Sequence, residues 1–308
     1  MPKTSKITVI GSANMDFICQ VSHLPAPGET VTDGVFNQVF GGKGANTAVA
    51  AARAGGDVAF VGCVGNDDLG QRTKENLESD GIDASDLTLL EGGTGGAALI
   101  FVDEKGENCI AVAPGTNNDV TPERIRECED VIARSGMVTL QMEIPPESNS
   151  EVMKLAEKHD VPVLLNYAPF RGGAVSIKQG VTWLVVNEVE VGALAECVVN
   201  DQDSAIKASR KLIEQGPEWV VVTLGKAGVV AVSADEVHRA DIYPLEVVDT
   251  TAAGDTFCGV FAAGLAEGMS EKDAMHFANA AANLTVTKLG AQPSIPNRGE
   301  ITRLLESI

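Results

Sequence analysis

Aromatic residues are scarce in this chain, since tryptophan, tyrosine and phenylalanine together make up only 4% of it, although 44% of its residues are hydrophobic. The apolar interior must therefore be built mainly from alanine, valine, leucine and isoleucine, which suits the close-packed layers of an α/β protein. With 308 residues the chain is long enough to bury a large core. This composition excludes a disordered or collagen-like chain.

Long apolar runs are also missing. No uninterrupted apolar stretch approaches the roughly 20 residues of a membrane-spanning helix, and residues 1–11 form a short strand pattern without the cleavage region of a signal peptide. We therefore expect a cytoplasmic protein with no membrane partner. The six cysteines are scattered, with no C-x-x-C pair and no nearby pair of histidines, so they indicate reduced thiols rather than a zinc site or a disulfide framework.

Positive charge is in short supply, because 23 Lys and Arg residues face 43 Asp and Glu residues and the formal net charge is -20. A protein that binds the phosphate backbone of a nucleic acid needs a basic stripe, and no cluster of Lys and Arg supplies one here. We therefore exclude nucleic acid as a partner. Small phosphorylated ligands are not excluded, since backbone N–H groups, a magnesium ion and a few local cations can bind a polyphosphate within an acidic protein.

Short segments rich in β-branched residues alternate with helical segments along almost the whole chain. This alternation is typical of a doubly wound α/β fold, in which helices cover both faces of a mostly parallel sheet. Helix starts are indicated by Thr121 before Pro122 and by Ser270 three residues before Asp273. Examples of the predicted strands are residues 7–10, 58–63, 138–142, 161–165, 183–186 and 219–223.

Two stretches, approximately residues 14–40 and 95–113, interrupt the alternation and read as antiparallel strands. In the second stretch, the strand-like residues 97–101 and 108–113 flank the turn signal at 103–106. No helical segment is available to cover a second face, so we expect a small β-sheet lid or an oligomer contact. Because no repeat or linker divides the chain, residues 1–308 are predicted to form a single domain with this discontinuous lid.

The most informative motif is the turn at residues 249–257, between a strand-like segment at 245–248 and a helical segment at 258–265. The free N–H groups of residues 252–255 would meet at a helix N-terminus, where the helix dipole favours an anion. Gly254 lets the backbone approach a ligand closely. Asp255 fits a base that accepts a proton from an attacking hydroxyl, although the same residue could be a simple helix cap.

A second glycine-rich turn, at residues 41–46, precedes the alanine-rich helical segment 47–54. Its glycines would let the backbone approach a ligand, and Lys43 and Asn46 add polar side chains. The spacing of a P-loop is absent, because Gly44 stands where that motif needs a serine or threonine. An ordinary turn remains the alternative interpretation.

Polar residues also follow several predicted strands, at the carboxyl ends where open α/β sheets bind ligands. Asn14 and Asp16 follow the first strand, and a carboxylate beside an amide suits the vicinal hydroxyls of a sugar. Glu143 ends the strand at 138–142 and fits the same site. Segments 187–190 and 223–228 offer an amide and a carboxylate for magnesium-bound water and a glycine turn for a nucleotide. Ordinary surface loops are the alternative for each.

In this order and spacing, the segments resemble the PfkB family of carbohydrate kinases, and most closely its ribose-phosphorylating members. The resemblance covers nearly the whole chain, from the Gly-Ser-Ala-Asn segment at 11–14 to Gly-Ala-Gln-Pro-Ser at 290–294. It implies transfer of the γ-phosphoryl group of ATP to the 5-hydroxyl of D-ribose, with magnesium and potassium as cofactors. It also implies a homodimer that forms through the β lid.

The same resemblance assigns roles to individual residues, with Asp255 as the catalytic base. Because a carboxylate of ordinary pKa, ~3.9, is a weak base, we expect Asp255 to take the proton late in the reaction. Glu190 would order the water shell of magnesium. The implied sugar ligands are Asn14, Asp16, Gly42, Lys43, Asn46, Glu143 and Asp255. The implied nucleotide ligands are Asn187, Thr223, Gly225, Lys226, Gly228, Ala252, Ala253, Gly254 and Asn279. The implied potassium ligands are Asp249, Thr251, Thr285, Lys288, Gly290 and Ser294.

Two alternatives stay open at this point. One is a PfkB kinase for another substrate, namely 2-deoxyribose, a ketohexose or a nucleoside. The other is a sugar-binding or regulatory protein that has the fold without the activity. The joint presence of Asp255, Gly254, Asn187 and Glu190 speaks against the second, because a binding protein needs neither a base nor a magnesium shell.

Overall fold

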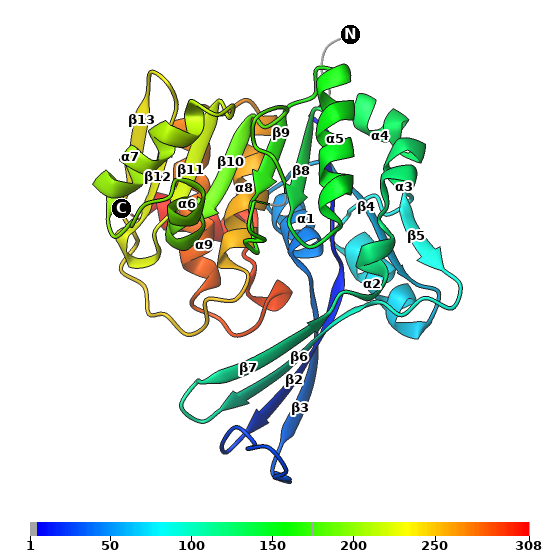
Figure 1. Ribbon diagram of the computed structural model, residues 1–308. Coiled ribbons are helices and arrows are strands. Elements are labelled where there is room, and N and C mark those ends of the chain that lie inside the picture. The colour runs from blue at the N-terminus through cyan, green and yellow to red at the C-terminus, as the bar shows by residue number, and fades with distance from the viewer. Residues whose placement is uncertain (1–4, 174, 308) are drawn as a thin grey trace.

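A large, mostly parallel sheet forms the centre of the molecule (Figure 1). The computed structural model describes residues 5–173 and 175–307, and in these residues nine strands join in the order β13-β12-β11-β10-β9-β8-β1-β4-β5. All neighbours pair in parallel except at one edge, where β12 is antiparallel to both β11 and β13. The strands are β1 (Ile7–Ile10), β4 (Val58–Gly65), β5 (Leu87–Leu90), β8 (Met137–Gln141), β9 (Val163–Asn166), β10 (Trp183–Asn187), β11 (Trp219–Thr223), β12 (Val229–Val232) and β13 (Val237–Ala240).

Helices cover both faces of this sheet, which confirms the predicted doubly wound α/β class. Alternate strand residues enter opposite cores: Val185 packs in one hydrophobic cluster, whereas Leu184 and Val186 pack in the other. The first cluster is covered by α1 (Lys43–Arg53), α2 (Asp68–Ser79), α8 (Ala253–Ala266), α9 (Glu271–Thr285) and α10 (Arg298–Glu306). The second is covered by α3 (Pro122–Glu127), α4 (Glu129–Ala133), α5 (Pro146–Lys158), α6 (Glu188–Leu194) and α7 (Gln202–Ile213).

Four further strands form a separate small sheet that projects from the body (Figure 1). Its order is β3-β2-β6-β7, and we call it the β lid; its strands are β2 (Asn14–Val21), β3 (Val35–Gly41), β6 (Gly96–Asp103) and β7 (Asn108–Ala113). The predicted hairpin of β6 and β7 is confirmed. Each predicted stretch forms an antiparallel pair, β2 with β3 and β6 with β7, and the two pairs join through a parallel pairing of β2 with β6 that the sequence did not predict. Both strands leave the body side by side, with Asn14 opposite Gly96, and run outward together.

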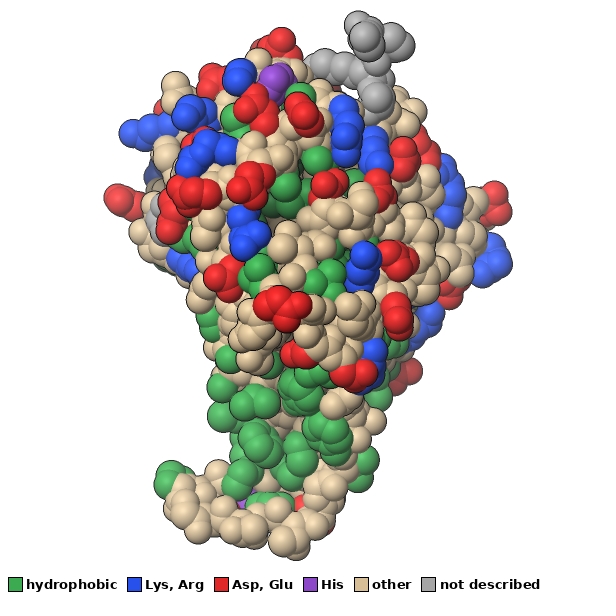
Figure 2. Space-filling model, turned by 90° about the vertical axis from the view of Figure 1, so that its right-hand side faces the viewer, with side chains coloured by type: hydrophobic (Ala, Val, Ile, Leu, Met, Phe, Trp, Pro, Cys, Tyr) green, Lys and Arg blue, Asp and Glu red, His purple; other side chains and the backbone are tan. Residues whose placement is uncertain are grey.

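One property of the β lid is its exposed apolar surface. Figure 2 shows hydrophobic side chains gathered on the narrow projection, whereas charged side chains are spread over the body. The largest of these apolar residues expose between 37% and 59% of their surface: Val35, Phe36, Leu99, Phe101, Ile110 and Val112. The strand register places Phe36, Leu99 and Phe101 on one face of the lid and Val35, Ile110 and Val112 on the other, so both faces expose apolar side chains. Exposed apolar surface of this extent marks a site of interaction.

Local sequence signals were correct in some places and misleading in one. Helices α3 and α9 begin after Thr121 and Ser270, and the side chain of each accepts a hydrogen bond from a backbone N–H in the first turn. Residues 245–248, predicted as a strand, form none. Their backbone bonds to a helix end instead, since Val248 N–H donates to the carbonyl of Val286. Among the described helices, none combines the length and the apolar character that a bilayer crossing requires.

Candidate active site

Two neighbouring cavities open at the carboxyl ends of the central strands, beside the base of the β lid. The larger has a volume of about 690 Å³ and the smaller about 260 Å³, and Thr223, Thr250 and Gly254 line both. The larger cavity is also lined by the predicted magnesium-site residue Glu190, by the predicted nucleotide ligand Asn187 and by all the predicted sugar ligands: Asn14, Asp16, Gly42, Lys43, Asn46, Glu143 and Asp255. It therefore brings together segments that are far apart in the sequence.

The glycine-rich turn at the start of α1 forms one wall of the larger cavity. Gly42 has a φ of 88°, and a Cβ there would lie 2.7 Å from the backbone nitrogen of Asn14. A Cβ on Gly44 would lie 2.6 Å from the backbone nitrogen of Ser12. These glycines are needed because the helix start packs directly on the segment that leads from β1 into the β lid.

Glu143 is held in place by this same turn. Its Oε2 accepts hydrogen bonds from the Ser12 hydroxyl at 2.6 Å and from the backbone N–H of Lys43 at 2.9 Å. The carboxylate therefore links three chain segments as well as lining the larger cavity.

Asp255 lies in the first turn of α8 and is 5% exposed. Its Oδ2 accepts a hydrogen bond from Asn46 Nδ2 at 2.9 Å, and its Oδ1 lies 3.9 Å from the Lys43 ammonium nitrogen. Burial raises the pKa of Asp255 above the ordinary aspartate value, against the opposing effects of Lys43 and Asn46. The expectation of an ordinary pKa was therefore wrong, and Asp255 is a stronger base than sequence alone predicts. The Asp255 charge in turn raises the pKa of Lys43.

Asp16 shares the larger cavity with several other carboxylates, among them Glu143 and Asp255. Burial raises its pKa to about 7, and the charges of Glu143 and Asp255 add to the effect. The cavity is therefore rich in groups that accept hydrogen bonds, as a ligand with several hydroxyl groups requires.

Asn46 has one amide atom without a partner. Its Oδ1 is buried and, among the described residues, has no hydrogen-bond donor. A buried acceptor without a partner is costly, so this atom fits a hydroxyl group of a bound ligand.

The turn before α8 differs in one detail from the sequence prediction. Ala252 has a left-handed backbone, with φ of 61°, and it precedes the first helical residue. This conformation folds the turn so that the N–H of Ala253 donates to the Thr250 carbonyl at 3.3 Å. The prediction that all the N–H groups of 252–255 are free was therefore wrong for Ala253. Helix α8 still directs its positive dipole end at the junction of the two cavities.

The smaller cavity is lined by most of the predicted nucleotide ligands: Thr223, Gly225, Lys226, Gly228, Ala253, Gly254 and Asn279. Ala252 lines the larger cavity instead. Sequence reasoning missed the apolar walls, which include Ile242, Tyr243, Leu245, Val247, Phe257 and Val286. The apolar segment at 245–248, before the 249–257 turn, was the available signal, but its composition predicts a strand.

Asn187 and Glu190 bond to each other at the start of α6. The Asn187 side chain accepts from the N–H of Glu190 at 2.9 Å, and Glu190 Oε2 accepts from the N–H of Asn187 at 2.8 Å. They thus form a helix capping box while lining the larger cavity. Burial raises the pKa of Glu190.

Hydrogen bonds connect three of the predicted potassium residues, Asp249, Thr251 and Gly290. Asp249 accepts hydrogen bonds from the N–H of Thr251 and from the N–H of Gly290, both at 2.9 Å. Burial opposes ionisation of Asp249, but a hydrogen bond from the Thr251 hydroxyl together with these two N–H bonds lowers the pKa of its carboxyl group.

The other predicted ligands are not equally suited to bind an ion by their side chains. The hydroxyls of Thr285 and Ser294 donate to the backbone carbonyls of Ala281 and Ala291, respectively. The Lys288 ammonium group pairs with Glu300 and is itself a cation. Lys288 would therefore serve a cation only through its backbone carbonyl, whereas the hydroxyl oxygens of Thr285 and Ser294 keep lone pairs but belong to fully buried residues.

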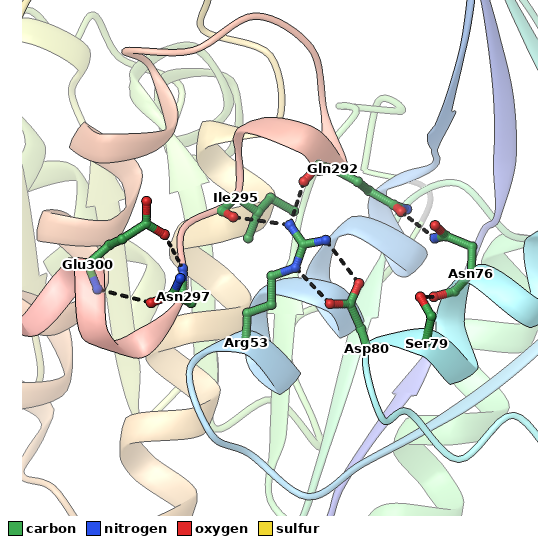
Figure 3. A network of polar contacts seen from close by, with 8 residues as sticks. All are labelled: Arg53, Asn76, Ser79, Asp80, Gln292, Ile295, Asn297 and Glu300. Atoms are coloured by element: carbon green, nitrogen blue, oxygen red, sulfur yellow. Dashed lines mark hydrogen bonds and ion pairs between the residues drawn. The ribbon is translucent and has the colours of Figure 1, made fainter.

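The loop that carries Gly290 and Ser294 is braced by a network that the sequence did not predict (Figure 3). Arg53, in the last turn of α1, donates to the carbonyls of Gln292 at 2.7 Å and Ile295 at 3.1 Å. The same guanidinium group binds both carboxylate oxygens of Asp80. Helix α1 therefore contributes to the larger cavity at its start and supports this loop at its end.

The fold and these two cavities define a kinase that acts on a small molecule. Residues 4–298 match the model of the pfkB family of carbohydrate kinases. The chain belongs to this PfkB family.

The similarity to proteins of named activity extends over almost the full chain. A ribokinase from Haemophilus influenzae is 37% identical over 97% of this chain and 98% of its own length. A deoxyribokinase from Salmonella typhimurium is 33% identical over 94% of this chain and 95% of its own length. The structure of Arabidopsis thaliana ribokinase complexed with ribose and ATP has a TM-score of 0.91 and 31% identity, covering 98% of this chain and 99% of that one.

Proposed function

We propose that this protein is a ribokinase, which transfers the γ-phosphoryl group of ATP to the 5-hydroxyl of D-ribose. The observation that carries the proposal is Asp255, a buried carboxylate of raised pKa at the start of α8, where the two cavities meet. Its position fits a base between a sugar in the larger cavity and a nucleotide in the smaller one. The similarity to ribokinases over nearly the whole chain supports the choice of sugar.

In this proposal the larger cavity binds ribose through groups that match its hydroxyls. Asp16 accepts hydrogen bonds from the 2- and 3-hydroxyls, and the unpartnered Oδ1 of Asn46 accepts another. Asn14, Gly42, Lys43 and Glu143 complete the sugar site. The 5-hydroxyl faces Asp255, which takes its proton as the new O–P bond forms and the bond to the ADP leaving group breaks.

The nucleotide occupies the smaller cavity and reaches the start of α8. Apolar walls suit the adenine ring, and the residues at 223–228, 252–254 and Asn279 surround it. The dipole of α8 and the Lys43 ammonium group stabilise the negative charge on the transferred phosphoryl group. Asn187 contributes from the edge of the larger cavity.

Two metal ions complete the proposed site. Glu190 fits the water shell of magnesium, because its carboxylate lines the cavity and has only one oxygen engaged by its own helix. Magnesium would neutralise charge on the phosphate groups. For potassium, the ionised Asp249 and the backbone carbonyls of residues 251, 285, 288, 290 and 294 are suitable oxygen donors. This ion would add positive charge near the anion-binding turn.

We also propose that two copies pair through the β lid, so that the exposed apolar side chains of one lid cover those of the other. Residues 14–41 and 96–113 then act as a discontinuous lid on one α/β domain that spans the chain. Lid closure would protect ATP from hydrolysis by water. Because the reaction consumes ATP, we expect the enzyme to act in the cytoplasm.

An ADP-release assay over a panel of sugars and nucleosides tests the proposed function. We expect the highest kcat/KM with D-ribose, and faster turnover in potassium than in tetramethylammonium at equal ionic strength. The main alternative is 2-deoxyribose, the substrate class indicated by the name of the Salmonella relative. A higher kcat/KM with 2-deoxyribose, a ketohexose or a nucleoside would overturn the choice of ribose.

A further inference from the structure

The side chain of Asn117 is hydrogen-bonded to Asn14, a residue in the wall of the larger cavity. Asn117 lies in the short helix η1 (Gly115–Asp119), which follows strand β7. Its side chain is 2% exposed and bonds to Asn14, a residue of the cavity wall. The sequence motifs did not identify Asn117 as functional.

The polarity of this contact follows from one backbone group. The N–H of Ala13 can only donate, and it donates to Asn117 across 3.0 Å, so the atom that receives it is Oδ1. The other end of the Asn117 amide is therefore Nδ2, which can also only donate. Since Nδ2 lies 2.7 Å from Asn14, the Asn14 atom at this contact must be the acceptor Oδ1. Asn14 is thus left with its Nδ2, a donor, to offer to a ligand.

A hydrogen-bond donor at this point complements the carboxylates of the larger cavity. Asp16, Glu143 and Asp255 are carboxylates, and when ionised they only accept hydrogen bonds. Each sugar hydroxyl has a single proton, so a hydroxyl that gives its proton to a carboxylate can make a further bond only as an acceptor. An amide nitrogen from Asn14 supplies that bond, whereas an amide oxygen there would leave two acceptors facing one proton.

The surrounding structure is shaped for this amide pair. A Cβ on Gly96, opposite Asn14 at the start of β6, would lie 2.1 Å from Asn14 Oδ1 and 2.3 Å from Asn117 Nδ2. Only glycine leaves room for the contact. Helix η1 is itself fixed to the central sheet, because the Thr116 hydroxyl donates to the carbonyl of Cys63 in β4 at 3.0 Å.

We propose that Asn117 is a positioning residue that fixes Asn14 as a hydrogen-bond donor to a sugar hydroxyl. The proposal rests on the proposed function, because it requires a sugar in the larger cavity. Asn117 does not touch the sugar, and its whole effect passes through the Asn14 amide. Its removal should therefore weaken sugar binding without slowing the chemical step.

The test is a double-mutant cycle with N117A, N14A and the double variant, measured as kcat and KM for ribose and for ATP. We expect N117A to raise the ribose KM about tenfold, while kcat and the KM for ATP change by less than about twofold. In the double variant the ribose KM should equal that of N14A, because Asn117 has nothing left to orient. N117D has nearly the same size and should behave alike, since its carboxylate attracts the Asn14 Nδ2 away from the sugar.

N149A is the matched control, because Asn149 is another buried asparagine whose Nδ2 donates a hydrogen bond, in its case to the backbone carbonyl of Gln141. It should leave the ribose KM unchanged. A wild-type protein that phosphorylates no sugar would overturn the proposed function itself. With an active wild type, effects of N117A and N14A that multiply in the double variant would overturn the role of Asn117 alone. If N117A does not fold, the same comparison of N117D with N117D/N14A decides the matter.

Discussion

Asn46 Nδ2 donates a hydrogen bond to Asp255 Oδ2 across 2.9 Å, although 209 positions separate the two residues in the chain. The contact exists because α8 packs very closely on α1, where a Cβ on Gly259 would lie 2.3 Å from the Thr47 carbonyl oxygen. One carboxylate oxygen of Asp255 is therefore fixed by α1. The second remains for the substrate, with the Lys43 ammonium group 3.9 Å from it.

Replacement of Asp255 by Asn should remove the proton acceptor and preserve the shape of the site. We expect kcat to fall by about 100- to 10,000-fold, while ribose affinity measured by calorimetry stays within a few-fold of wild type. D273N is the control, since Asp273 lies in the first turn of the neighbouring helix α9, away from both cavities. A folded D255N enzyme that retains more than a tenth of wild-type kcat would contradict the role of Asp255.

Asp16 should determine the preference for ribose over 2-deoxyribose. If this carboxylate accepts from both the 2- and 3-hydroxyls, the deoxy sugar loses one bond to a charged group, at a cost of roughly 1.5 to 3 kcal/mol. We expect ribose to exceed 2-deoxyribose by about 10- to 150-fold in kcat/KM, and D16A to harm both sugars and erase most of the difference. Comparison of the two sugars in both enzymes provides the measurement. A preference that survives in D16A would show that another residue reads the 2-hydroxyl.

The raised pKa of Asp16 also predicts how stability depends on pH in the absence of ligand. Between the ordinary aspartate pKa of 3.8 and the folded-state pKa of about 7, the folded protein keeps a proton that the unfolded chain has lost. The free energy of unfolding should therefore fall as pH rises through this window, by up to about 1.4 kcal/mol per pH unit from this group. Urea unfolding at pH 5 and pH 7 measures it. D16N should lose this contribution, whereas D68N, at an exposed position, should keep it; identical pH dependence in wild type and D16N would refute the assignment.

The Arg53 network predicts a loss of stability that is coupled to the potassium response. R53A removes hydrogen bonds to two loop carbonyls and leaves the mostly buried Asp80 carboxylate without its partner. We expect the free energy of unfolding to fall by about 2 to 3 kcal/mol and half-maximal activation to need more potassium. Arg72 pairs with Asp68 at the surface, so R72A should cost less than about 0.5 kcal/mol. Chemical denaturation measures the free energy of unfolding, and a titration of the reaction rate with potassium measures the concentration needed for half-maximal activation. If R53A needs no more potassium than wild type, the Arg53 network does not support the cation site.

Much of the fold could be predicted from the sequence because its signals are local. The period of the apolar segments identified the central strands, and the capping residues Thr121 and Ser270 marked two helix starts correctly. The parallel pairing of β2 with β6 could not be predicted, because it depends on where two distant segments leave the body. The apolar segment at 245–248 had the composition of a strand, but it lies beside the end of α9 and bonds there.

The candidate site likewise has residues that local patterns predict and residues that only distant contacts explain. Glycine-rich turns and polar strand ends pointed to the residues of the larger cavity, since such positions have local chemical reasons to exist. The raised pKa of Asp16 depends on three carboxylates from separate segments, and no local pattern shows that convergence. Arg53 and Asn117 act on backbone groups or amides far away in the sequence. Residues of this kind carry no motif, and only the folded arrangement reveals them.

One competition experiment tests the central claim most directly. Wild-type protein is given equal concentrations of ribose, 2-deoxyribose, fructose and adenosine. The mixture also contains magnesium, potassium and a limiting amount of ATP. The phosphorylated products are then quantified by mass spectrometry. Product ratios in such a mixture report the ratios of kcat/KM. The account predicts that D-ribose 5-phosphate dominates, by at least tenfold over the deoxy sugar, and that D255N forms almost none. A different dominant product, or equal amounts of the two pentose phosphates, would contradict it.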